Sequence, residues 1–239
     1  MFSTSLGLGL RGRTSIDARV KSAMSGVAAC GLYNPNVLAS NFQERLTPTT
    51  QAGNGDPVGY IESQANPAND ITAFSDANRP TLTADGSLFY WDISSGAPSG
   101  LSWDVSGTLS SYDIGFVIQT TDTSAILISN DALSENLNMS SGSSSSAFGG
   151  SIGTPAVIKD GVTQSITTRI DLYNAISGAE KRAIQITGCN FTGSSQVGLG
   201  RQGETVASLF GKVYAMYGCP TGTISDADGL AWLNSAGGL

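Results

Sequence analysis

Short strand-like segments separated by turn residues dominate this sequence. They are rich in β-branched and aromatic residues, end at Gly, Pro, Asn or Asp, and lie at 58–63, 87–93, 101–107, 112–121, 124–130, 155–160, 162–166, 182–191, 196–200 and 205–218. Charged residues make up only 13% of the chain and glycine numbers 30, which favours strands and turns over helices with charged faces. The 239 residues therefore predict an all-β chain, folded as one jelly-roll β-sandwich with a few short helices.

Two of the connections have the composition of tight hairpin turns. Asp160 and Gly161 separate two strand-like segments, as expected for a two-residue hairpin. The stretch 121–123 also predicts a hairpin between its flanking strands. The Ser/Gly-rich segment 139–150 is predicted to be a loop inside the sandwich, because strand-like segments resume directly after it.

A helix is predicted near the N-terminus, from Thr14 to about residue 29. Its apolar residues follow at spacings of four, four and three and form one stripe: Ile16, Val20, Met24 and Val27. The stripe is compatible with a helix that docks onto a larger assembly, and equally with a helix packed on the chain's own sandwich. Residues 1–28 are therefore interpreted as an N-terminal attachment segment, partly helical, and residues 29–239 as the sandwich.

Two further short helices are predicted within the sandwich. The segment 167–178 changes to a helical period, with Thr168 as the N-cap and Gly178 as the end. Near the C-terminus Ser225 is a second N-cap, and Leu230 and Leu233 are expected to face inward. The two aspartates after Ser225 suit a helix start better than a calcium loop, because the glycine and glutamate positions of an EF-hand are missing.

The charge is distributed unevenly along the chain. The first 21 residues contain four basic residues and one aspartate, a net charge of +3, so the rest of the chain carries −10 of the total of −7. The candidate attachment residues are these four basic ones: Arg11, Arg13, Arg19 and Lys21. With only 12 basic residues in all, a nucleic-acid partner is not expected.

The cysteine and histidine content limits which metal sites and catalytic mechanisms this chain can have. Cys30, Cys189 and Cys219 are odd in number and have no paired spacing, so we expect free thiols made in a reducing cytosol, without a metal site. The chain has no histidine, which removes Ser-His-Asp and Cys-His catalysis. A glycosidase with two carboxylates stays open in principle, but Asp and Glu lie mainly at turns. We predict no catalytic residue, no cofactor and no membrane insertion.

Aromatic residues in the first strands allow two interpretations. Trp91, Trp103 and Tyr112, with Tyr90 beside them, could form a stacking platform for a glycan. Aromatic residues at strand spacing are also typical of a core.

Several ordered phrases resemble a family of tailed-phage virion structural proteins with a concanavalin A-like, laminin-G-type domain. The resemblance begins at Leu32-Tyr33-Asn34-Pro35 and continues through "NFQERLTPTTQAGNGDPVGYIES" (41–63) and "ANRPTL" (77–82). It extends over the phrases at 115–129, 160–188 and 210–234, the last being similar to the closing strand and final helix of that family. The phrase "FYWDISSGAPSG" (89–100) departs from the "FDGVDD" of the family, so no ligand site is carried over there.

The resemblance implies both a fold and a function. The stretch before the first strand would be scaffold, with Tyr33 and Phe42 fixing it on the sandwich and the turn at 53–57 leading into the strand. The chain would be a non-enzymatic virion component of head or tail, made in the host bacterial cytoplasm and bound to other virion proteins. A homotrimer stays open, although the sequence has no heptad repeat. The alternative is a carbohydrate-binding adhesin that recognises host surface glycans.

Overall fold

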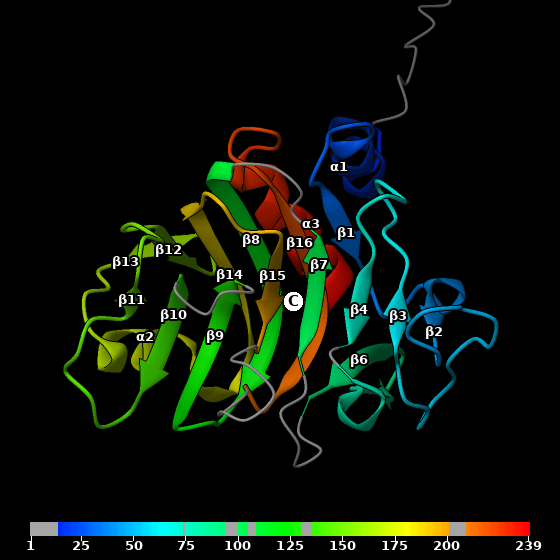
Figure 1. Cartoon of the computed structure of the whole chain (residues 1–239), viewed down its shortest axis with the longest axis horizontal. Coiled ribbons are helices and arrows are strands. Elements are labelled where there is room, and N and C mark those ends of the chain that lie inside the picture. The colour runs from blue at the N-terminus through cyan, green and yellow to red at the C-terminus, as the bar shows by residue number, and fades with distance from the viewer. Residues whose placement is uncertain (1–13, 74, 94–99, 105–108, 131–134, 201–208) are drawn as a thin grey trace, which may run out of the picture.

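Two antiparallel sheets face each other in the computed structural model, which describes residues 14–73, 75–93, 100–104, 109–130, 135–200 and 209–239 (Figure 1). Sheet A has the order β13 (Val162–Gln164), β12 (Ala156–Lys159), β14 (Gly178–Phe191), β8 (Leu109–Thr120), β16 (Lys212–Pro220), β6 (Leu88–Asp92) and β5 (Thr81–Asp85), and β1 (Gly31–Tyr33) also pairs with β16. Sheet B has the order β11 (Phe148–Gly149), β10 (Asn136–Ser140), β9 (Ser124–Asn130), β15 (Gln196–Leu199), β7 (Leu101–Asp104), β4 (Ile71–Ala73), β3 (Tyr60–Ile61) and β2 (Asn41–Phe42). The predicted all-β architecture is confirmed at the level of two packed eight-stranded sheets.

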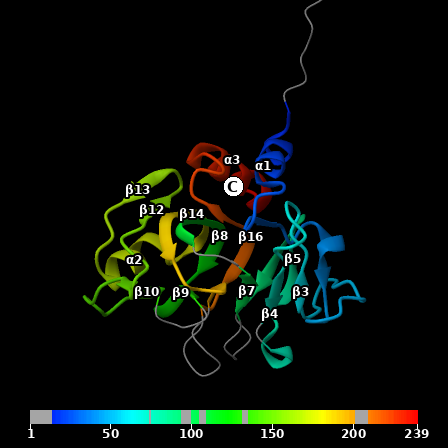
Figure 2. The same ribbon diagram turned by 45° about the horizontal axis from the view of Figure 1, so that its top comes forward.

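Helices form a third layer on the outer face of sheet A. The C-terminal helix α3 (Asp226–Gly237) contacts β8, β14 and β16, and the N-terminal helix α1 (Ile16–Met24) packs against α3 (Figure 2). The shorter α2 (Arg169–Ile176) instead contacts β10 of sheet B. Two 3₁₀ turns, Leu38–Ser40 and Asp76–Asn78, complete the described elements. None of these helices has the length and apolar character needed to span a bilayer.

The burial of β8 reflects these three layers. Seven consecutive residues, 112–118, are buried. Ile114 and Phe116 belong to the core between the two sheets, whereas Val117 belongs to a second core under the terminal helices. A strand covered on both faces loses the alternation of apolar and polar residues, which explains the continuous apolar run from Ile114 to Ile118 in the sequence.

Tyr217 holds the helix layer close to sheet A. A Cβ atom added at Gly115 of β8 would lie 2.2 Å from the Tyr217 ring, and one added at Gly229 of α3 would lie 2.7 Å from its hydroxyl. Gln185 donates from its amide to this hydroxyl and to the carbonyl of Asp226, both at 3.0 Å. Glycine in a helix costs about 1 kcal/mol relative to alanine, and here its missing side chain makes the close approach of helix and sheet sterically feasible.

The predicted helix at 167–178 begins as expected but ends differently. The Thr168 hydroxyl accepts from the Asp171 amide and the Asp171 carboxylate accepts from the Thr168 amide, which forms a capping box. These hydrogen bonds from Thr168, with others from Thr167, lower the pKa of Asp171 to about 2. The predicted end at Gly178 is wrong: the helix stops at extended Ser177, and Gly178 is the first residue of β14.

The Asp160-Gly161 hairpin is confirmed. Strands β12 and β13 pair directly across it, with φ angles of 49° at Asp160 and 82° at Gly161. Both angles lie in the left-handed region that a type I′ turn requires. The Ser/Gly-rich segment after Met139 stays within the sandwich, since β10 and β11 lie at its two ends and pair with each other.

The hairpin predicted at 121–123 is wrong. Strand β8 before it belongs to sheet A, and β9 after it pairs with β10 and β15 in sheet B. Asp122 stabilises this crossing, because its carboxylate accepts from the amides of Ser124 and Phe210, each at 3.1 Å. The segment therefore connects the two layers instead of turning within one.

The long stretch before the first predicted strand is scaffold, as expected. Tyr33 is completely buried in β1, and its hydroxyl donates to the carbonyl of Asn69. Phe42 packs edge-on against Tyr60 with ring centroids 6.3 Å apart. Gly55 has a φ of 89°, so the turn into β3 uses a backbone conformation that glycine tolerates best.

Candidate functional site

The face formed by α1 and α3 is the candidate attachment site, because it carries two of the four predicted basic residues. Helix α1 begins after Ser15, whose hydroxyl accepts from the Ala18 amide at 3.2 Å. Its apolar stripe points inward: Val20 and Met24 are fully covered by the core under the terminal helices. Of the two alternatives for this helix, packing on the chain's own sandwich is the one observed.

This packing changes how the N-terminal segment is divided. Residues 14–28 contribute to the same core as β16 and α3, so they are part of the packed body and not a separate segment. An independent attachment segment could include only residues before Thr14. Arg11 and Arg13 belong to that part, which lies outside the described residues.

The two described basic residues are held by carboxylates on the same face. The Arg19 guanidinium lies 2.6 Å from the Asp228 carboxylate of α3, and the Lys21 ammonium lies 2.9 Å from Asp17 one turn earlier. These four side chains carry two positive and two negative charges, so their summed charge is zero. Exposed ion pairs of this kind contribute about 0–1 kcal/mol each, and their main effect here is to fix the side-chain positions.

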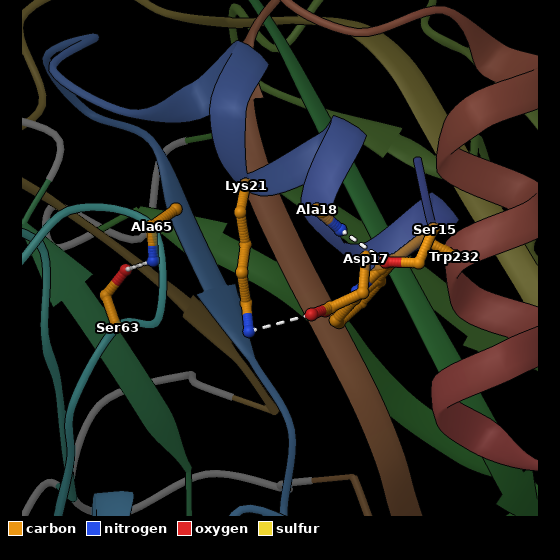
Figure 3. A network of polar contacts seen from close by, with 7 residues as sticks. All are labelled: Ser15, Asp17, Ala18, Lys21, Ser63, Ala65 and Trp232. Atoms are coloured by element: carbon orange, nitrogen blue, oxygen red, sulfur yellow. Dashed lines mark hydrogen bonds and ion pairs between the residues drawn. The ribbon is translucent and has the colours of Figure 1, made fainter. Parts of the chain in front are cut away.

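Asp17 also connects the two helices through Trp232. The indole N–H of Trp232 donates to the Asp17 carboxylate at 3.2 Å, while the other carboxylate oxygen contacts Lys21 (Figure 3). The Trp232 ring is 1% exposed and packs edge-on against Tyr217 with ring centroids 6.4 Å apart. Sequence reasoning overlooked Trp232, although its position in the stripe Gly229, Trp232, Leu233 and Ala236 has helical spacing and identifies it as a buried residue.

The expected aromatic platform is not present on the surface. Trp91, Trp103 and Tyr112 are each no more than 1% exposed and belong to the core between the sheets. A ring that stacks on a sugar must expose one of its faces, so this structure corrects the glycan-stacking interpretation in favour of a core. Tyr90, the fourth aromatic residue considered, is 7% exposed, and the Lys212 ammonium lies 4.7 Å from the centre of its ring.

The polar atoms of these buried rings are paired inside the protein. The indole of Trp91 donates to the side chain of Asn41 at 2.7 Å, and that of Trp103 donates to the Tyr112 hydroxyl at 3.2 Å. Tyr112 in turn donates to the carbonyl of Ala29 at 2.7 Å. Burial raises the pKa of Tyr112 well above its usual value, so the phenol stays protonated and keeps this hydrogen bond.

Asp113 is a buried carboxylate with a structural role. It is 5% exposed and accepts from the Gly188 amide at 2.9 Å and from the Thr221 hydroxyl at 2.6 Å. It thereby ties an irregular part of β14 to the turn that follows β16. Within the described ranges no cluster of three or more Cys, Asp or Glu residues could hold a metal ion.

A shallow hollow of about 300 Å³ lies beside the crossing between β8 and β9. It is lined by Gln119, Thr120, Thr121, Asp122, Phe210, Gly211 and Lys212. The Asp122 carboxylate in it already accepts two backbone hydrogen bonds. We therefore interpret the hollow as part of the turn that connects the two sheets, and assign no ligand to it.

Comparison with known proteins leaves the chain without an assigned relative. No protein-family model matches it, and neither a curated protein nor a solved structure matches it.

Proposed function

We propose that this chain is a non-enzymatic structural component of a tailed-phage virion, located on head or tail. Its sandwich is a concanavalin A-like jelly roll, and the residues before Thr14 attach it to neighbouring virion proteins. The chain is made in the bacterial cytoplasm and becomes part of the particle by assembly.

One observation carries this proposal: the first and the last of the sequence phrases that resemble the phage family are neighbours in space. The "LYNP" phrase lies in and after β1, and the closing phrase contains β16 and most of α3. Leu32 pairs with Tyr217 and Tyr33 with Met216, although about 180 residues separate them in the sequence. The two phrases therefore belong to one structural unit. Two matching phrases that lie together in the fold support a common fold with the phage family more strongly than two matching phrases in separate parts of the chain would.

The arrangement of layers suggests which side of the chain attaches. The terminal helices cover the outer face of sheet A, and sheet B lies on the opposite side of the core (Figure 2). A chain attached near Thr14 would direct sheet B away from its anchoring partner. Arg19 and Lys21 are engaged by Asp228 and Asp17, so Arg11 and Arg13 are the basic residues that we assign to the partner.

The glycan-binding alternative has less support. It was based on Trp91, Trp103 and Tyr112, and all three rings are in the core. The remaining argument is the analogy between sandwich folds, which serve many functions.

A chain that begins at Thr14 tests the attachment role. It keeps every contact described above, so we expect the circular dichroism spectrum of the folded full-length chain and a strong reduction of its amount in purified particles. A matched pair separates charge from length: Arg11→Gln with Arg13→Gln should reduce incorporation, whereas Arg19→Gln should not. Equal incorporation of the full-length and shortened chains would show that attachment uses another part of the molecule.

A further inference from the structure

The strand register brings two of the three cysteines together. Strands β1 and β16 are antiparallel, and Gly31 pairs with Gly218. Cys30 directly precedes β1, and Cys219 directly follows Gly218 in β16, so continuing the register by one position places the two cysteines opposite each other. Directly opposite residues on antiparallel strands have Cα atoms about 4.5–5.5 Å apart, which lies within the range of about 4.4–6.8 Å that a disulfide spans.

Both of these side chains lie on the same face of sheet A. Cys30 and Cys219 are fully buried, and both belong to the core under the terminal helices. Cys189 is also buried, but in the core between the sheets. Sheet A therefore separates Cys189 from the pair.

The backbone around Cys30 holds the thiol in this position. Ala29, just before it, has a φ of 61°, which is uncommon for a residue with a side chain. The carbonyl of Ala29 accepts from Tyr112, and the Cys30 amide donates to the carbonyl of Val27 at 3.3 Å. Two hydrogen bonds thus fix the peptide group before the cysteine, and the pairing of β1 with β16 fixes the chain after it.

We propose that Cys30 and Cys219 form an intramolecular disulfide that locks β1 to β16 when the folded chain meets a small-molecule disulfide such as glutathione disulfide. The proposal concerns the thiols of this chain and does not depend on the virion role. The bond would join the end of the turn that follows α1 to the last strand, so it would fix α1 on the sandwich. It would turn a fold made with free thiols into a cross-linked one.

The reaction proceeds in two exchange steps. Both thiols are fully buried in the folded chain, so the reaction begins when local opening of the turn between α1 and β1 exposes the Cys30 thiol. The Cys30 thiolate attacks one sulfur of glutathione disulfide, which forms a mixed disulfide and releases one glutathione thiolate. The Cys219 thiol then loses its proton and attacks the Cys30 sulfur, which releases the second glutathione thiolate. The two cysteine sulfurs lose two electrons, glutathione disulfide gains them, and the two thiol protons end on the two glutathione molecules.

The pKa values of the two cysteines differ in the direction that this order of steps requires. Interaction with Cys219 lowers the pKa of Cys30, with a further contribution from Thr223, while the same pairing raises the pKa of Cys219. Cys30 is therefore the attacking thiol and Cys219 the resolving one. Cys189 lies in the core between the sheets, on the other side of sheet A from both of these thiols, and burial raises its pKa.

Trypsin digestion gives a direct test, because each cysteine falls in a different peptide. Cleavage after Lys and Arg places Cys30 in peptide 22–45, Cys189 in 183–201 and Cys219 in 213–239. The folded, reduced chain is incubated with glutathione disulfide, free thiols are blocked by alkylation, and the digest is analysed by mass spectrometry. We expect one linked species, 22–45 joined to 213–239, with 183–201 alkylated, and a shift of the urea unfolding midpoint to higher concentration.

Two variants complete the test. Cys189→Ala should leave the linked species unchanged, and Cys30→Ala should abolish it. Three results would overturn the proposal: no link in the folded chain, a link only in chain unfolded by urea, or links that include 183–201. A dimer on a non-reducing gel in place of the internal link would overturn it as well.

Discussion

Replacing Trp232 by alanine should destabilise the protein by about 3–5 kcal/mol. The substitution removes a large ring that is 1% exposed from the core under the terminal helices, together with its edge-on contact with Tyr217. It also removes the hydrogen bond to Asp17 that links α3 to α1. Urea unfolding followed by circular dichroism measures the loss, which is a large fraction of the about 5–15 kcal/mol that stabilises a typical domain.

Ser235→Ala on the same helix is the matched control. Ser235 is exposed, so its substitution should change the free energy of unfolding by no more than about 0.5 kcal/mol. If Trp232→Ala were equally mild, α1 and α3 would not form the core described above. The terminal helices would then be free to act as a separate attachment segment.

Replacing Trp91 by alanine should be as damaging, with a loss of about 3–5 kcal/mol. Trp91 is fully buried between the sheets, and its indole is the hydrogen-bond donor to the side-chain carbonyl of Asn41. The substitution leaves a cavity and removes the indole donor from the buried side-chain carbonyl of Asn41. The same urea titration measures the effect.

Leu46→Ala is the control for this second substitution. Leu46 is 82% exposed, so its replacement should have little effect on unfolding. The experiment also distinguishes the two interpretations of the aromatic residues. A variant at Trp91 that stays fully stable and loses affinity for a glycan would restore the platform interpretation.

The elements that the sequence predicts correctly depend on neighbouring residues. The Asp160-Gly161 turn, the Thr168 cap and the apolar stripe of α1 each depend on positions within one or two turns of the chain, and local geometry alone determines them. The hairpin expected at 121–123 depends instead on which sheet receives β9. Both flanking strands are apolar in either case, so the local pattern does not distinguish a hairpin from a crossing between layers.

The candidate site also depends on contacts between distant parts of the chain, which the local sequence does not show. The basic charge of Arg19 is evident in the sequence, but its partner Asp228 is 209 positions away and was interpreted only as part of a helix start. Burial of Trp91 and Trp103 on the inner faces of the two sheets also depends on how the layers pack. The spacing of aromatic residues along a strand shows which of them share a face, and not whether that face is covered.

Detecting the chain in purified particles tests the proposed virion role most directly. Immunogold labelling with an antibody against the sandwich shows its place on intact particles, and mass spectrometry of dissociated particles finds any copies inside them. The account predicts a constant number of copies per particle, with label at a fixed place on head or tail. Chain that is plentiful in the lysate but absent from both measurements would contradict it.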